Sequence, residues 1–181
     1  MNSVHAHSKH NFHHHAARLK PIIEPVVLKV SVIEPVLRRL ALYSPDAEKL
    51  LMGTVAIESS FVFVTQMGGG PARGLFQMEV ATFNDLMNRF LAAKPHRALR
   101  EQVLGFATEN NPGADHMKVN HSFAAAMARV KYYTIHKTIP SSITEQAHYW
   151  SVYYNGISPH GLRPADYLER WNKYCAPLYA S

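Results

Sequence analysis

Residues 44–59, SPDAEKLLMGTVAIES, carry the signals of one buried helix and decide the fold class of the chain. Ser44 is a typical N-cap, Pro45 suits the first helical position, and Asp46 complements the positive end of the helix dipole. Apolar residues then cover every side of the helix, as in a helix at the centre of a domain: Leu50, Leu51, Met52, Val55, Ala56 and Ile57. The sequence thus predicts a central helix that ends close to the carboxylate of Glu58.

The segments around this helix carry further helix and turn signals. After it, the β-rich FVFV of residues 61–64 and the turn signal Gly68-Gly69-Gly70-Pro71 predict a small hairpin or an irregular loop. Helical spacing and capping patterns predict helices over Pro35–Leu42, 80–92, 95–106, 120–136, 142–155 and from Pro164 to about Tyr174. The sequence therefore predicts an α+β fold, mostly α.

The composition describes a folded protein with a basic surface. The chain has 181 residues, 47% of them apolar and 18% charged, with a formal net charge of +6. Such a charge favours acidic partners: nucleic acid, an anionic membrane or the bacterial cell wall. The basic residues are scattered, so we expect no nucleic-acid-binding arm, and a generally cationic, solvated surface is the alternative. No apolar stretch approaches the roughly 20 residues of a membrane span.

The cysteine and histidine content limits the kinds of metal site that the chain can form. One cysteine, Cys175, rules out an internal disulfide and a cysteine-based metal site. The histidine-rich residues 1–19 suit a tag-like extension, a partner-ordered arm or a metal-binding tract. These histidines have no nearby carboxylate to orient them, so we expect no metal and no other cofactor: His10, His13, His14 and His15. The polar start is also unlike a secretory signal.

Glu58 is a candidate catalyst because it ends a largely apolar helix. Partial desolvation raises the pKa of a carboxyl group, and a protonated carboxyl can protonate the leaving oxygen of a glycosidic bond. The alternative is an ordinary solvated glutamate at a helix end. That alternative places a negative charge at the negative end of the helix dipole, which is electrostatically unfavourable.

Three short motifs, in this order, resemble one enzyme family. They are Glu58-Ser59-Ser60-Phe61, then Ala72-Arg73-Gly74-Leu75-Phe76-Gln77-Met78, and finally Tyr153-Tyr154-Asn155-Gly156. They are similar to E-S-x-F, G-A-x-G-L-x-Q and A-Y-N-x-G of the soluble lytic transglycosylases, peptidoglycan-cleaving members of the lysozyme-like superfamily. The resemblance covers about residues 44–172. It implies a lysozyme-like catalytic domain over 44–181 with a small β-hairpin or loop beside the cleft, preceded by a lead-in segment over 20–43.

The resemblance also implies roles for individual residues. Glu58 would be the catalytic acid/base, and Ser59 would hydrogen-bond its carboxyl or the substrate. Gln77 would line the sugar groove. Tyr154 and Asn155 would face Glu58 across the cleft, with the Tyr154 hydroxyl positioning the carboxyl or an N-acetyl group. A purely structural role is the alternative for the last three residues.

The chain departs from the family pattern at two places. Tyr153 replaces the usual small residue before the tyrosine-asparagine pair, which is expected to reshape one wall of the cleft. The segment between the first two motifs is short and carries three glycines, so the sugar subsites could differ from those of the family.

The distribution of acids bears on the mechanism. Glycoside hydrolases generally use two carboxylates, yet no Asp or Glu occurs from residue 59 through 78. We interpret Glu79 as a residue that complements the dipole of the next helix, and Asp85 and Asp115 are not excluded as a second acid. The shortage favours a transglycosylase with one acid/base, whose product would be a 1,6-anhydro sugar, over a lysozyme-type hydrolase.

The function implied is cleavage of the MurNAc–GlcNAc β-1,4 bond in peptidoglycan glycan strands. Without a signal, such a chain resembles a phage-encoded endolysin or a virion-associated protein, made in the cytoplasm and acting on the cell wall. The alternatives are a peptidoglycan hydrolase and a non-catalytic virion or secretion-apparatus component that docks through its first 40 or so residues. A DNA-binding domain would rest on charge alone.

Overall fold

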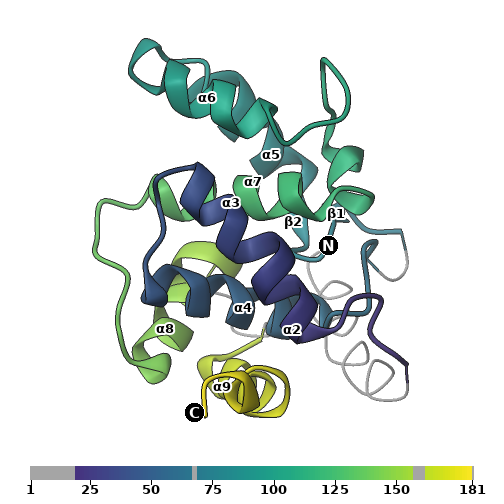
Figure 1. Ribbon diagram of the computed structural model, residues 1–181, viewed down its shortest axis with the longest axis vertical. Helices are drawn as coiled ribbons and strands as arrows, with labels where there is room; N and C mark the ends of the chain where they lie inside the picture. The colour runs from purple at the N-terminus through teal and green to yellow at the C-terminus, as the bar shows by residue number, and fades with distance from the viewer. Residues whose placement is uncertain (1–18, 67–68, 157–161, 181) are drawn as a thin grey trace, which may run out of the picture.

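Helix α4, Pro45–Ser59, lies at the centre of the computed structural model, which describes residues 19–66, 69–156 and 162–180 (Figure 1). The Ser44 hydroxyl accepts a hydrogen bond from the Ala47 amide at 3.0 Å, so the predicted N-cap is confirmed. Leu50, Leu51 and Met52 are fully buried, and so are Val55, Ala56 and Ile57 one turn later. The helix is therefore packed on every side, as the sequence predicts.

A second long helix crosses α4 and is built from three segments: α2 (Pro25–Leu28), the π-helical η1 (Lys29–Ile33) and α3 (Glu34–Arg39). The prediction of a helix from Pro35 to Leu42 is wrong at both ends. The helix begins at Pro25, and Pro35 lies inside it, where the wider π-helical turn accommodates a residue without an N–H. Its buried side chains pack against α4 and α7.

In the described part of the chain, the strands form one antiparallel pair, β1 (Ala72–Arg73) with β2 (Met78–Glu79). The hairpin predicted here is present, but the β-rich FVFV segment does not form its strands. Ser60 and Phe61 have positive φ angles of 52° and 62° and reverse the chain directly after α4. The amides of Val62 and Phe63 then donate to the Ser59 carbonyl, so the start of this segment closes the helix. Its end meets the hairpin: the Val64 carbonyl accepts from the Gly74 amide at 2.8 Å, and the next residue, Thr65, forms an isolated antiparallel bridge with Arg73.

The remaining helices follow the sequence prediction closely. The first of them is α5 (Val80–Asp85), which continues as the π-helical η2 (Leu86–Phe90). Two more are α7 (His121–Tyr133) and α8 (Ile143–Trp150), the latter continuing as the π-helical η5 (Ser151–Asn155). The others are η3 (Lys94–His96), α6 (Arg97–Leu104), η4 (Ala114–Lys118), α9 (Pro164–Tyr174) and η6 (Ala176–Leu178). The π-helical turns and the short helices η4 and η6 were not predicted.

Small residues let neighbouring helices approach α4 closely. Gly53 faces the hydroxyl end of Tyr167 on α9, and a Cβ atom at Gly53 would collide with that ring. On the α7 side, Thr54 Oγ1 and the Tyr132 hydroxyl lie 2.8 Å apart in a buried hydrogen bond. Figure 1 shows α9 and α6 at opposite ends of the long axis, with α4 between them. No helix in the described ranges is both long and apolar enough to cross a membrane.

Candidate active site

A cleft of about 250 Å³ opens where the end of α4, strand β2, helix α7 and the π-helical turn η5 meet. Four of the five predicted site residues line it: Glu58, Gln77, Tyr154 and Asn155. Its other lining residues are Glu79, Thr82, Lys131, Val152, Tyr153 and Gly156. The structure therefore brings the three sequence motifs together at one place.

Glu58 enters the cleft from the last turn of α4. Its side chain is 6% exposed, and the Trp150 indole Nε1–H donates to its Oε1 atom at 3.1 Å. Trp150 is itself fully buried, so this bond holds the carboxyl in one orientation. The solvated helix-end glutamate, which was the alternative, does not describe this environment.

Gln77 faces the cleft because the turn between the two strands is unusually tight. Its backbone has a φ of 44°, and its side-chain Nε2 donates to the Gly74 carbonyl at 2.8 Å. Gly74 has a φ of 72°, and a Cβ atom there would lie 2.6 Å from the Met117 carbonyl oxygen. Only glycine fits such a position without displacing the backbone behind it. Positive φ angles at non-glycine residues store strain, which clusters at functional sites.

Tyr154 and Asn155 form the opposite wall through contacts with the backbone. The Tyr154 hydroxyl donates to the Phe76 carbonyl at 2.9 Å, which ties η5 to the hairpin turn. Burial, and after it the nearby Glu58 charge, raises the pKa of Tyr154 well above its ordinary value, so this phenol stays a neutral donor. Asn155 Nδ2 donates to the Leu162 carbonyl at 3.2 Å. The Tyr154 hydroxyl is thus anchored to the protein backbone, whereas the resemblance implies that it positions the Glu58 carboxyl or an N-acetyl group.

Ser59 is not part of the cleft. It is fully buried, and its hydroxyl donates to the Val55 carbonyl at 3.2 Å, one turn back along α4. Successive residues on an α-helix point about 100° apart, so the neighbour of a cleft-facing residue points into the core. The role expected for Ser59, a hydrogen bond to the carboxyl or the substrate, is therefore corrected to a structural one.

A second carboxylate does lie in the cleft. Glu79 belongs to β2 and precedes α5; its side chain is exposed and makes no capping hydrogen bond with that helix. It lines the cleft together with Glu58. The other two acids lie elsewhere: Asp85 pairs with Arg89 at 2.8 Å, and Asp115 with Arg73 at 2.6 Å. The interpretation of Glu79 as a helix-dipole residue is thus incomplete.

Lys131 is a cleft residue that sequence reasoning missed. Its Nζ donates to the Tyr154 carbonyl at 2.7 Å and lies 3.8 Å from the centre of the Tyr154 ring. A signal was available, because Ala124, Met127 and Ala128 are apolar and stand seven, four and three positions before Lys131 on one helix face. A cation on a buried helix stripe is uncommon unless it meets a specific partner.

The search for metal ligands and the comparisons with known proteins both gave negative results. The residues that the structure describes contain no group of three or more His, Cys, Asp or Glu side chains placed to hold a metal ion. The four histidines considered for a metal, His10, His13, His14 and His15, lie outside those residues. The chain matches no protein-family model, no curated protein and no solved structure.

Proposed function

We propose that the protein is a lytic transglycosylase that cuts the MurNAc–GlcNAc β-1,4 bond of peptidoglycan, with Glu58 as its acid/base. The observation that carries this proposal is the cleft itself. It gathers Glu58, Gln77 and the Tyr154–Asn155 pair from motifs that stand up to 97 positions apart in the sequence. The same proposal gives the chain a lysozyme-like fold and a phage-related role in cell-wall penetration or host lysis.

The proposed reaction uses one carboxyl group twice. The Glu58 carboxyl protonates the glycosidic oxygen as the bond to the anomeric carbon breaks, and the substrate's N-acetyl group assists. The Glu58 carboxylate then takes the proton from the C6 hydroxyl of the same muramic residue, whose oxygen closes on the anomeric carbon. The products are a 1,6-anhydro sugar and a free chain end, and no water is consumed.

The surroundings of Glu58 suit a group that changes protonation state during the reaction. Removal of a carboxyl group from solvent disfavours its charged form. A positive charge in the same cleft, here Lys131, favours the charged form. The indole donor of Trp150 holds the oxygen in place in both states.

Hydrolysis is the second candidate, and Glu79 is the observation that favours it. Inverting glycosidases hold two carboxyl groups about 6.5–9.5 Å apart, with a water between them. Glu79 borders the cleft from the hairpin side, so it could activate such a water. The absence of acids from residue 59 through 78 is therefore weaker support for transglycosylation than the sequence alone indicates.

Digestion of purified peptidoglycan with mass analysis of the products separates the two reactions. We expect anhydro-muropeptides from the wild type and from Glu79→Gln, with Glu79→Gln less than about tenfold slower. Glu58→Gln should lower the cleavage rate by about a thousandfold. Its carbonyl oxygen can still accept the Trp150 hydrogen bond, so folding should be preserved.

Glu101→Gln is the matched control. Glu101 lies on α6, its side chain is 67% exposed, and it pairs with Arg97 at 3.1 Å, away from the cleft. This variant should cleave like the wild type. Reducing-end products that disappear in Glu79→Gln would establish hydrolysis instead. No cleavage by the folded wild type would overturn the enzyme proposal and favour a non-catalytic wall-binding component.

A further inference from the structure

A second cavity, of about 630 Å³, lies at the other end of α4. Ser44 and Asp46, at the start of that helix, border it. None of the residues that line the cleft around Glu58 borders this cavity. Its further lining comes from α7, the segment after α7, and the η2–η3 region, and includes Arg129, Tyr133, His136, Lys137, Phe90 and His96.

Aromatic rings form one wall of this second pocket. Phe90 and His96 stack with their ring centres 4.0 Å apart and an interplanar angle of 24°. The Tyr133 ring meets them edge-on, at 6.3 Å from Phe90 and 6.5 Å from His96. Such a wall presents a flat face together with polar ring atoms, as in sites that bind small polar ligands.

Arg129 brings a positive charge into the pocket without a matching negative one. Its Nε donates to the Leu42 carbonyl at 3.5 Å, which is a long hydrogen bond, and its guanidinium lies 5.9 Å from the Tyr133 ring centre. It makes no ion pair with any carboxylate in the part of the chain that the structure describes, including Asp46 across the same pocket. Burial lowers the pKa of Arg129, because the surroundings disfavour its charge. An anionic ligand would supply the missing partner.

The charges around the pocket favour an anion in the same way. Arg129, Lys137 and two histidines face a single acid, Asp46. The start of α4 adds the positive end of a 15-residue helix dipole. Arg129 is half-buried whereas Lys137 is exposed, and the Arg129 guanidinium is shaped to bind a carboxylate through two parallel hydrogen bonds.

Two contacts between side chains connect the second pocket with the cleft. Lys137 lines the pocket, Tyr153 lines the cleft, and the Lys137 Nζ atom lies 5.7 Å from the Tyr153 ring centre. A pair of tilted tyrosine rings provides the second connection: the ring centres of Tyr132 in the pocket and Tyr154 in the cleft lie 5.1 Å apart. Tyr153, the residue that departs from the family pattern, therefore lies between the cleft that it lines and Lys137 of the pocket.

We propose that the pocket around Arg129 binds a carboxylate of the peptide carried by the glycan strand whose sugars occupy the cleft. This inference rests on the proposed function, because peptidoglycan bears carboxylate-rich peptides on its muramic residues. Arg129 would hold the carboxylate, and the Phe90–His96–Tyr133 wall would pack against the peptide backbone. The pocket would then select peptide-bearing strands over strands without peptides.

Peptide binding can be measured without cleavage. A synthetic cell-wall tetrapeptide with free carboxylates is titrated into the full chain and followed by NMR. We expect shifts at Arg129, His96 and Tyr133, and an affinity at least about tenfold weaker in Arg129→Gln. The same peptide with its carboxylates amidated should not bind. Should Arg129→Gln fail to fold, Lys137→Gln takes its place, since Lys137 is exposed.

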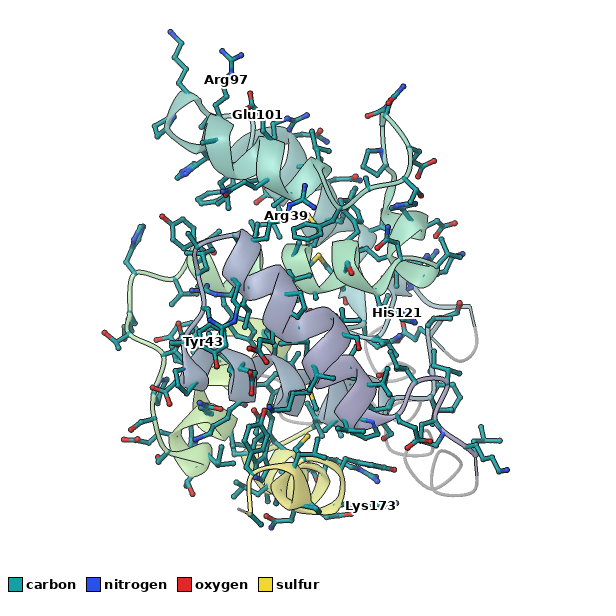
Figure 2. The ribbon with its side chains drawn as sticks, viewed as in Figure 1. Arg39, Tyr43, Arg97, Glu101, His121 and Lys173 are labelled. Carbon is teal, nitrogen blue, oxygen red and sulfur yellow. The ribbon has the colours of Figure 1, made fainter. Side chains whose placement is uncertain are left out.

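Arg97→Gln is the matched control for charge. Arg97 follows His96 directly, but Figure 2 shows it on α6, pointing away from the body of the protein, and its side chain is 84% exposed. This variant should bind the peptide like the wild type. The proposal is overturned if the wild type shows no shifts at the pocket, if Arg97→Gln weakens binding as much as Arg129→Gln, or if inorganic phosphate gives the same shifts as the peptide.

Glycan strands stripped of peptide distinguish this inference from the proposed function. Cleavage of stripped and peptide-bearing strands at equal rates, with no peptide binding, would overturn the pocket assignment and leave the enzyme proposal standing. Peptide binding at Arg129 without cleavage of either strand would support the pocket assignment and overturn the enzyme proposal.

Discussion

The two ends of helix α4 both border a cavity, yet they are built in opposite ways. At the start, Ser44 caps the helix and Asp46 complements its dipole, as stability requires. At the end, Glu58 places an acid beside the negative pole, and Ser60 and Phe61 adopt positive φ angles. The start of α4 thus has the features that stabilise a helix, whereas its end has features that destabilise one. Such local destabilisation is typical of functional sites, so the contrast indicates that the site lies at the end of α4.

The largest effect on stability is expected in the turn that faces Glu58. Gly74→Ala forces a φ of 72° on a residue with a Cβ atom and pushes that atom towards the Met117 carbonyl. We expect a loss of about 2–4 kcal/mol in the free energy of unfolding, measured by chemical denaturation. Gly113→Ala is the control, because Gly113 has a φ of −84° and open space around it. Equal losses in both variants would contradict the assigned role of Gly74.

The start of α4 should show a smaller effect. Ser44→Ala removes the hydroxyl that accepts the Ala47 amide, so the free energy of unfolding should fall by about 1 kcal/mol. Ser141→Ala, an exposed position outside the helices, should change it by less than about 0.5 kcal/mol. A Ser44→Ala variant as stable as the wild type would contradict the statement that the Ser44 cap stabilises the start of α4.

The end of α4 should show the smallest effect, with the opposite sign. Ser60→Gly relieves the left-handed backbone at a φ of 52° and loses only a weak hydroxyl bond to the Ala56 carbonyl at 3.4 Å. We expect a gain of about 0.5 kcal/mol in the free energy of unfolding, after the entropy cost of glycine. Thermal denaturation measures the sign, and a clear loss of stability would show that the Ser60 side chain matters more than the strain.

Local signals made most of the helices predictable from the sequence. The cap at Ser44 and the one at Ser142 act within a few residues, and both are present as expected. The candidate site was also largely predictable, because Glu58, Gln77, Tyr154 and Asn155 belong to short motifs with a recognisable order. Ser59 was misassigned because a motif records neighbours in sequence, whereas the helix turns them to different faces.

The features missed depend on contacts between distant segments. The hydrogen bond from Trp150 to Glu58 joins residues 92 positions apart, and no local pattern predicts it. The π-helical turns η1, η2 and η5 depend on packing around them, since such turns are rare in isolation. Glu79 was visible as an acid, but its place in the cleft follows from the hairpin that turns it towards Glu58.

The most direct test of the account is to separate binding from cleavage at Glu58. Glu58→Gln should bind purified glycan strands within about threefold of the wild type, while its cleavage rate falls by about a thousandfold. That result would identify Glu58 as a group needed for the reaction and not for holding the substrate. A folded Glu58→Gln protein that cleaves within about tenfold of the wild-type rate would contradict the central claim.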